Sequence, residues 1–366
     1  MALAGLRVLE LGTVISAPYC GLLLAESGAE VIKIELASGD PYRGPNPLGA
    51  ASTSFQVLNR GKKSVTIDLS TEEGKSTVVN LVLESDVLIE NMRPGTLDRH
   101  GLGPDHLRSI NPKLVYCSIS GMGDGGPDRD RPGYDPIAMA VSGLWSQMSS
   151  LSAPEPVGPP IADLLTGVLA AQRVLAAFIG AQRTGHGSRV YASLLGSALS
   201  LQMLATERYQ SEGEIPDELS RARHSQSFGF IAGDGRPFAV HLSSRQKFWL
   251  SLIDAIEHPE LAKSADFKSA TDRIRNYSQL HAALSSIFST MDRDHWLKSL
   301  VQHDVPAAPI NNLAEGLADP QVAFVTSNER DQKAELGPAP ALGEHNYLLK
   351  KSKQDASAGG KSELGK

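Results

Sequence analysis

Residues 7–35 read RVLELGTVISAPYCGLLLAESGAEVIKIE, and this stretch decides the fold class. Residues 7–11, with Val8, Leu9 and Leu11, predict a buried strand, and residues 30–36 alternate as a second strand. Between them, Ser16 stands where a helix N-cap is expected, Pro18 falls in the first turn, and Gly28 can end the helix. The stretch therefore predicts a strand, a loop, a helix and a second strand.

The same alternation continues beyond this stretch. The expected strands cover 64–69, 86–90, 114–120 and 190–195, and the expected helices cover 71–85, 104–110 and 163–181. Strands separated by helices favour a mostly parallel α/β sheet. The helix at 163–181 has the strongest pattern, because its apolar residues fall on one face and Arg183 and Gly185 mark its end.

A length of 366 residues suggests about two domains. After residue 200 the alternation of strands and helices gives way to a polar, charged segment, followed by a short hairpin and several helices. We assign 1–200 to a large domain, the polar residues 201–222 to a linker, and 223–320 to a smaller α+β domain. A hairpin is expected there, from 228–231 and 237–242 with a Gly-Asp-Gly turn between them. The Gly-, Ser- and Lys-rich tail, 352–366, is expected to be disordered.

Composition excludes several classes of protein. The 35 basic and 41 acidic residues give a net charge of −6, whereas a general nucleic-acid binder usually carries a basic excess. The two cysteines, Cys20 and Cys117, do not suggest a disulfide scaffold and suit a reducing compartment. We see no signal peptide, no run of about 18 apolar residues and no zinc-like spacing of histidines. We therefore expect a cytoplasmic protein without a membrane span or a metal site.

A glycine-rich segment, residues 121–126, matches the letters of the dinucleotide fingerprint G-x-G-x-x-G. The residues that follow it are PDRDRPGYD, with two prolines and dense charge where the fingerprint requires a helix. The context therefore favours a mobile surface loop, and it weakens the hypothesis of a nicotinamide-dependent oxidoreductase.

Nine segments in order resemble the class III CoA-transferase family, in particular its formyl-CoA transferase-like group. They are residues 7–35, NRGKKSVTIDL, DVLIENMRPGTLDRHGLG, NPKLVYCSISGMGDGGP, PGYD, IADLLTG, RTGHGSRVYASLL, DVPAAPI and APALGEH. The resemblance covers about residues 3 to 348. It implies a Rossmann-like large domain built from both chain ends, with 321–351 as a short linker and the C-terminal return. It also implies an interlocked homodimer.

The resemblance places a catalytic aspartate at Asp163, in IADLLTG. It implies transfer of CoA from an acyl-CoA to a carboxylic acid through an aspartyl anhydride and an aspartyl-CoA thioester, which is covalent catalysis by a carboxylate. The plain alternative is that Asp163 is the N-cap of the helix at 163–181. The two interpretations are compatible, because a helix N-terminus also stabilises an anion.

The phosphates of CoA need cations and N–H donors. Arg93 and Arg99 follow the strand at 86–90, and the resemblance implies that their segment, which starts at Asn91 and Met92, contacts CoA. Arg60, Lys62 and Lys63 form a second basic group. Each of these charges could equally be a solvated surface residue. No tightly bound cofactor is expected beyond CoA or acyl-CoA as substrate.

Three further positions fall near the expected reaction centre. Val14 and Ile15 match the loop that approaches the active carboxylate, and Ile15 stands where some relatives carry a polar amide. Tyr134 stands where the related α-methylacyl-CoA racemases have a histidine, and a tyrosine with a pKa near 10 shuttles protons poorly at neutral pH. It is instead expected to pack beside the CoA thioester.

Alternatives to CoA transfer stay open at this point. The first is an acyl-CoA racemase or epimerase, although HLSSRQKFW lacks the glutamate that those enzymes use. The second is a non-catalytic acyl-CoA binding protein. The stretch ARHSQSFGFIAGDG lacks the glycine run of formyl-CoA transferases, which disfavours formyl-CoA and oxalate as the natural pair. In that stretch His224 and Gln226 either face an acyl pocket or lie at the surface.

Overall fold

The computed structural model describes residues 1–46, 51–156, 158–243 and 245–349, and the chain divides into two compact units. The large unit contains residues 1–145 and 156–207 together with the described residues from 330 onward. The small unit contains residues 146–155 and 208–329. The tail predicted at 352–366 lies outside the described residues.

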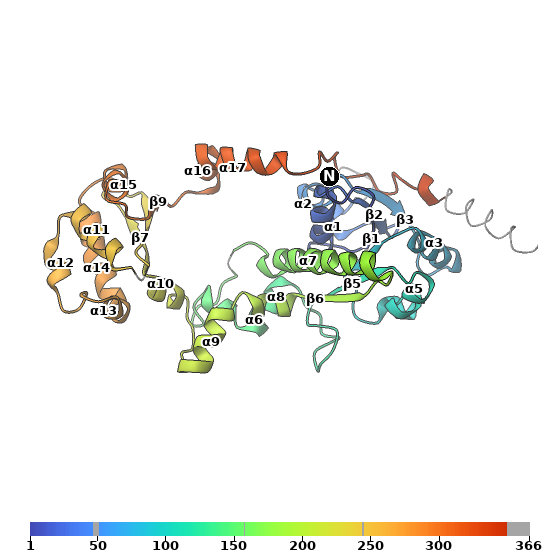
Figure 1. The fold of residues 1–366 in the computed structure, drawn as a ribbon, viewed down its shortest axis with the longest axis horizontal. Coiled ribbons are helices and arrows are strands. Elements are labelled where there is room, and N and C mark those ends of the chain that lie inside the picture. The colour runs from blue at the N-terminus through green and yellow to red at the C-terminus, as the bar shows by residue number, and fades with distance from the viewer. Residues whose placement is uncertain (47–50, 157, 244, 350–366) are drawn as a thin grey trace, which may run out of the picture. The chain divides into compact units, whose positions relative to one another are not determined.

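A parallel sheet organises the large unit (Figure 1). It has six strands in the order β3-β2-β1-β4-β5-β6. The strands are β1 Arg7–Leu11, β2 Glu30–Glu35, β3 Lys63–Thr66, β4 Val87–Glu90, β5 Val115–Ser120 and β6 Arg189–Ser193. In the central pairings, Val8 of β1 lies opposite Val31 of β2 and Val87 of β4. The predicted mixed α/β fold with a parallel sheet is confirmed. The strand order reverses between β1 and β4, which is where open α/β sheets bind ligands.

The helices of this unit cover both faces of the sheet. They are α1 Ser16–Glu26, α2 Thr53–Asn59, α3 Glu72–Leu83, α4 Thr96–Arg99, α5 Pro104–Ile110, α6 Asp135–Ser142, α7 Ile161–Thr184 and α8 Leu194–Ser200. Alternate strand residues enter two separate cores, since Val8 packs with α1 and α7 while Leu9 packs with α3 and α5. This alternation follows from the two-residue period of a strand whose two faces are both buried.

Helix α7 is, within the described residues, the one helix long and apolar enough to cross a membrane by length and composition. Its apolar run is interrupted by Gln172 and Arg173. Ala170, Ala171 and Val174 of this helix are buried in the core that it shares with α1 and the sheet. The apolar character of α7 therefore serves packing, at least on this face, and the same packing fixes the first turn that carries Asp163.

The described C-terminal residues return to the large unit. The Gly343 amide donates to the Ser64 hydroxyl at 3.0 Å, and the Thr66 amide donates to the Asn346 side chain at 2.8 Å. These contacts lie along β3, the edge strand of the sheet. Both ends of the chain therefore contribute to the large unit.

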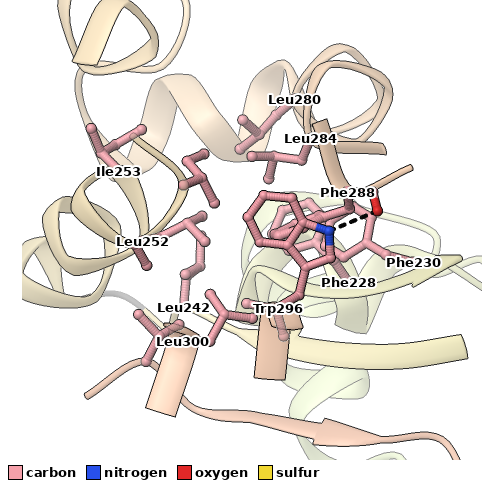
Figure 2. Close-up of a cluster of buried hydrophobic side chains, with 14 of the residues drawn as sticks. Phe228, Phe230, Leu242, Leu252, Ile253, Leu280, Leu284, Phe288, Trp296 and Leu300 are labelled. Atoms are coloured by element: carbon pink, nitrogen blue, oxygen red, sulfur yellow. Dashed lines mark hydrogen bonds between the residues drawn. The ribbon is translucent and has the colours of Figure 1, made fainter. Parts of the chain in front are cut away.

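The small unit has a three-stranded antiparallel sheet of β7 Ser227–Ile231, β8 Pro237–His241 and β9 Ala307–Pro309. The first two strands are the expected hairpin. Its helices are α10 Ser220–Ser225, α11 Gln246–Ile256, α12 Pro259–Lys263, α13 Ala270–Arg275, α14 Tyr277–Phe288, α15 Arg293–Gln302 and α16 Leu313–Ala318. An aromatic cluster fills its core, and Figure 2 shows the Trp296 indole donating to the Phe288 carbonyl at 2.8 Å.

Two helices fall where the sequence indicates only linkers. Helix α9, Met203–Glu212, lies within 201–222, and helix α17, Pro320–Asp331, begins at the end of the segment assigned to the small domain and continues into 321–351. Neither helix has a buried residue in this chain. Because a helix without a buried face needs no apolar stripe, the periodicity that identifies other helices is weak here.

Candidate active site

The turn between β1 and α1 lies at the carboxyl end of β1, beside the end of β4. Asn91, just after β4, holds this turn: it accepts from the Thr13 amide at 2.9 Å and donates to the Thr13 carbonyl at 2.8 Å. Val14 has φ +68°, in the left-handed region that β-branched residues rarely adopt. The two loops at the switch point of the sheet are therefore joined through one amide side chain.

Asp163 lies in the first turn of α7, which begins at Ile161. The expectation that Asp163 is the N-cap is wrong, because the cap position is Pro160, which has no capping side chain. Asp135 of α6 caps the helix instead, since its Oδ1 accepts from the Ala162 amide at 2.7 Å and from the Asp163 amide at 3.1 Å. The Asp163 carboxyl group is therefore left for other partners.

The environment of the Asp163 carboxyl group disfavours its charge. The residue is 7% exposed, and burial raises its pKa to about 6, with the nearby Asp135 charge adding to the effect. Hydrogen bonds from the Ser16 hydroxyl and the Ser16 amide oppose this rise in pKa. The result is a carboxylate that is ionised at neutral pH yet weakly solvated, which favours nucleophilic reactivity.

A cavity of about 170 Å³ opens on one side of Asp163. It brings together six of the residues singled out in the sequence: Val14, Asn91, Met92, Arg93, Tyr134 and Asp163. Arg129 and Arg131 line it as well, so three arginines lie in its wall, of which Arg131 also pairs with Asp128 at 3.1 Å. Such a cavity can hold an anionic ligand against the reactive carboxylate.

A second cavity, of about 360 Å³, opens on another side of the same carboxylate. It shares Val14, Tyr134 and Asp163 with the first cavity and adds Ile15 and Tyr42. Its remaining described lining residues are Asp135, Pro136, Met139, Trp145, Pro156, Gly158, Pro159 and Pro160, none of them basic. Asp163 therefore stands between a basic space and a mostly apolar one.

Glu90 ends β4 below the segment that carries Arg93. Its Oε2 accepts from the Met92 amide at 2.9 Å, which fixes the start of that segment. Burial raises the pKa of Glu90 to about 7, against hydrogen bonds from Met92 and Ser118 and the charge of Arg189. Glu90 is thus a second carboxyl group close to the site that titrates near neutral pH.

The structure separates the other predicted basic residues from Asp163. Arg99 lines a different cavity, with Lys75 and His100, and donates to the Thr96 hydroxyl. Arg60 pairs with Glu26 and lines none of these cavities. The Lys62 ammonium group is fully buried and contacts Glu10, Asn59 and the Pro18 carbonyl. A phosphate cannot reach Lys62 without displacing these partners.

His224 and Gln226 lie in the small unit and make contacts within it. His224 meets the Ser220 carbonyl at 2.8 Å and the Glu214 carboxylate at 3.3 Å. The Gln226 side chain is fully buried; its Oε1 accepts from Arg273 at 2.7 Å and its amide donates to the Ser243 carbonyl at 2.7 Å. Gln226 therefore packs inside the small unit and does not lie at its surface.

Sequence reasoning missed several residues that shape the site. The sequence predicts Ser16 only as a helix N-cap, and this is wrong, because Ser16 is the first residue of α1 and the cap position is Ile15. Ser16 instead lines the cavity beside Asp163 and lowers the pKa of its carboxyl group. Asp135, Arg129 and Arg131 belong to the charged segment after the glycine-rich loop, and their density there is the one signal that could have pointed to them. The structure confirms that no helix follows that loop before Asp135.

Known proteins of one family match this chain along nearly its whole length. Residues 3–354 match the family model of CoA-transferase family III. The chain is 37% identical to the succinyl-CoA:mesaconate CoA-transferase of Haloarcula hispanica, over 88% of this chain and 83% of that protein. It is 33% identical to the acetyl-CoA:oxalate CoA-transferase of Acetobacter aceti, over 87% and 83%.

Solved structures agree with the sequence comparison. A CAIB/BAIF family protein from Brucella suis superposes with a TM-score of 0.80 at 31% identity, over 95% of this chain and 98% of that one. Such a match extends over both units and requires the same succession of strands and helices. With its Asp163 between two cavities at the switch point of the sheet, this chain belongs to CoA-transferase family III.

Proposed function

We propose that this protein moves CoA from an acyl-CoA donor to a carboxylic acid acceptor, with Asp163 as the covalent catalytic residue. The observation that carries the proposal is the position of Asp163, a buried carboxylate with a pKa of about 6 between the basic and the apolar cavity. Both cavities border Asp163, so a ligand in either one lies next to this residue. Family membership and the names of the relatives support the reaction class.

The proposed chemistry conserves the thioester energy in four steps. The Asp163 carboxylate attacks the donor thioester carbonyl, forms an anhydride and expels CoA thiolate. The thiolate attacks the Asp163 carbonyl, which gives an aspartyl-CoA thioester and frees the donor acid. The acceptor carboxylate attacks this thioester, forms a second anhydride with Asp163 and again expels thiolate. The thiolate then attacks the acceptor's acyl carbonyl, which releases the new acyl-CoA and restores the Asp163 carboxylate.

We propose that the basic cavity holds the CoA side of the substrate. Arg93, Arg129 and Arg131 supply charge for phosphate oxygens, and Asn91 and Met92 form the wall beside them. Arg99 stays a proposed anion contact in its separate cavity, together with Lys75. Arg60 and Lys62 are left out of this set, because neither lines the basic cavity: Arg60 pairs with Glu26, and the Lys62 ammonium is buried against Glu10.

We propose that the acyl group occupies the second cavity, against Ile15, Tyr42 and Tyr134. The relatives named for succinyl-CoA:mesaconate and acetyl-CoA:oxalate transfer make succinyl-CoA and acetyl-CoA the first donors to test. We further propose a cytoplasmic homodimer of interlocked chains with a Rossmann-like large domain. Exposed apolar side chains such as Leu204 and Leu313 support a partner surface, and the strand order 3-2-1-4-5-6 supports the domain type.

A transfer assay tests the function directly. Each acyl-CoA donor is incubated with a panel of acids, and the new acyl-CoA is measured by chromatography with wild-type protein and with Asp163→Asn. The proposal expects donor-dependent product from wild type and none from the variant. Rapid α-deuteration of a 2-methylacyl-CoA in D2O without any acceptor acid would instead indicate a racemase. Binding without either reaction would indicate a non-catalytic acyl-CoA binding protein.

A further inference from the structure

The turn that carries Val14 and Ser16 adopts a conformation that its sequence does not favour. A valine at φ +68° is strained by about 1–2 kcal/mol, and such a conformation persists only where the surroundings enforce it. The turn has a consequence for the site, since Ser16 and Asp163 lie in the wall of the same cavity, and the Ser16 hydroxyl and amide lower the pKa of the Asp163 carboxyl group. What enforces the turn therefore also orients the reactive carboxylate.

Buried polar side chains contact the turn and the start of α1 at successive points. The Lys33 ammonium donates to the Gly12 carbonyl at 2.5 Å. The Val14 amide donates to Asp40 Oδ1 at 3.3 Å. The Lys62 ammonium donates to the Pro18 carbonyl at 2.8 Å. Together with the clasp of Asn91 on Thr13, these contacts fix the backbone on both sides of Val14.

The charged members of this set are joined to each other. Lys33 pairs with Glu10 at 3.0 Å and with Asp40 at 2.9 Å, and Lys62 pairs with Glu10 at 2.7 Å. All four side chains are 0% exposed. We call these four residues the buried ion network. Two cations and two anions balance, so each charge depends on the others being present.

Two glycines leave the space that the network and the turn need in the packed core. A Cβ atom on Gly21 of α1 would lie 2.1 Å from Glu10 Oε2, so only glycine leaves room for that carboxylate. A Cβ atom on Gly167 of α7 would lie 2.9 Å from the Ser16 carbonyl, so α7 can approach the turn closely. Asp163 lies one turn earlier on the same helix.

Stability alone does not explain such a network. Replacing a buried ion pair by apolar residues of similar volume is often neutral or stabilising, because desolvation offsets the attraction. A buried ion network can instead stabilise one backbone conformation over its alternatives. Here the geometry that it fixes is the turn that meets Asp163.

We infer that Lys33 and Asp40 are positioning residues for CoA transfer: through the buried ion network they hold the Val14 turn so that Ser16 faces the Asp163 carboxylate. The inference rests on the proposed role of Asp163. Neither Lys33 nor Asp40 lines the two cavities beside Asp163, so they act through the turn and not on the substrate.

The experiment removes the pair together, so that no unpaired buried charge remains. Lys33→Met/Asp40→Ala deletes the anchors of Gly12 and Val14, whereas Lys33→Met/Asp40→Asn keeps an acceptor oxygen for Val14. Arg273→Met removes a buried cation from the small unit and serves as the matched control. We expect the Ala variant to lose at least about tenfold in kcat with KM for acyl-CoA within about twofold. The Asn variant recovers part of the loss, and the control retains wild-type kcat.

Two further readouts separate positioning from general damage. Loss of the Ser16 contacts should raise the Asp163 pKa, so the acidic limb of the rate profile should move to higher pH in the Ala variant. The other groups near Asp163, namely Asp135, Tyr42, Tyr134 and the three arginines of the basic cavity, are not substituted in either variant. Asp40 Oδ1 also accepts from the Tyr42 amide at 2.9 Å, and the Asn variant keeps an oxygen for this bond as well. Hydrogen exchange in residues 11–19 should become faster in the Ala variant than in wild type.

The outcomes decide between the inference and the proposed function. Wild-type kcat and an unmoved acidic limb in the folded Ala variant would overturn the inference. If the Ala variant does not fold, the Asn variant decides, since unchanged kcat and unchanged exchange there also overturn it. If wild type transfers no CoA at all, the proposed function fails. Exchange at residues 11–19 then still shows whether the network holds the turn.

Discussion

The cores of the two units are built in contrasting ways. The small unit is filled mainly by apolar and aromatic side chains, part of which Figure 2 shows. Phe230, Phe238 and Phe288 pack ring against ring. The large unit has apolar cores as well, but beside the Val14 turn it buries two lysines and two carboxylates without exposure. The small unit does bury a cation, Arg273, but against neutral partners, whereas the network of paired charges lies next to the candidate active site. The contrast teaches that the molecule places linked buried ion pairs where they contact the backbone of the Val14 turn.

The contrast also separates two kinds of contribution to the free energy. Burial of aromatic rings contributes stability in proportion to the apolar area removed from water. Buried charges contribute little net stability but cost several kcal/mol when one partner is lost. Substitutions in the two regions should therefore differ in what they change, either the free energy of unfolding or the rate and its pH dependence.

The largest expected effect is on the rate. Asp163→Asn should lower CoA transfer by at least about a thousandfold, because an amide oxygen cannot form the anhydride. Steady-state rates with the best donor and acceptor measure it. The fold should be intact, since Asn is isosteric with Asp. A residual rate within tenfold of wild type would remove Asp163 from the mechanism.

The aromatic core should give the largest loss of stability. Phe288→Ala should reduce the free energy of unfolding of the small unit by about 3–5 kcal/mol, the usual effect of emptying a buried aromatic site. Phe324→Ala in α17 is the matched control, because Phe324 is 59% exposed, and it should change stability by less than about 0.5 kcal/mol. Denaturant titration at several pH values checks both, and the Phe288 effect should not depend on pH between 6 and 9.

Asp163 itself should cost the fold some stability. Its pKa rises from 3.8 in the unfolded chain to about 6 in the folded one, so folding disfavours its charge. The cost is absent below pH 4, grows between pH 4 and 6, and is complete above that range. Asp163→Asn should therefore be more stable than wild type at pH 8, by on the order of 1–3 kcal/mol. Equal stabilities at pH 8 would contradict the assigned environment.

The same pKa predicts the acidic limb of the rate profile. Because the carboxylate form reacts, kcat/KM should fall as pH decreases through about 6, tenfold for each further unit. Glu90, with a pKa of about 7, is the other group that titrates nearby. Glu90→Gln is therefore the control, and its kcat/KM should still fall as pH decreases through about 6. A limb that disappears with Glu90→Gln would assign the titration to Glu90.

The smallest expected effect concerns Tyr134. It lines both cavities but is 65% exposed in this chain, so Tyr134→Phe should change kcat/KM by less than about threefold. A loss of a hundredfold or more would show that the hydroxyl group takes part in proton transfer. That result would favour the racemase hypothesis over CoA transfer, and α-deuteration would be measured in the same variant.

The sheet was predictable because each buried strand between two helices leaves a local apolar pattern, as in residues 7–11 and 30–36. The motif IADLLTG was sufficient to select Asp163 as the candidate catalytic residue. The structure supplies the residues that surround its carboxyl group. Its capping by Asp135 was not predictable, since Asp135 lies 28 residues away and meets the helix only in the folded chain. Pattern therefore located the carboxylate but not the groups that set its pKa.

Lys62 shows that sequence also cannot identify the partner of a charged residue. In sequence it belongs to a basic group that could bind phosphate, yet the folded chain buries it against Glu10, 52 residues earlier. Lys33 lies in a strand whose neighbours on both sides are also buried, so alternation gives no sign of its partners. Charge in sequence shows which residues can form ion pairs, while the tertiary fold decides which of them do.

Trapping the intermediate tests the central claim most directly. The protein is incubated with succinyl-CoA or acetyl-CoA, quenched with hydroxylamine, digested and examined by mass spectrometry. The account predicts a hydroxamate on Asp163 that depends on the acyl-CoA donor and is absent from Asp163→Asn. A donor-dependent hydroxamate on another carboxyl group, or active transfer with Asp163 left unmodified under the same quench, would contradict it.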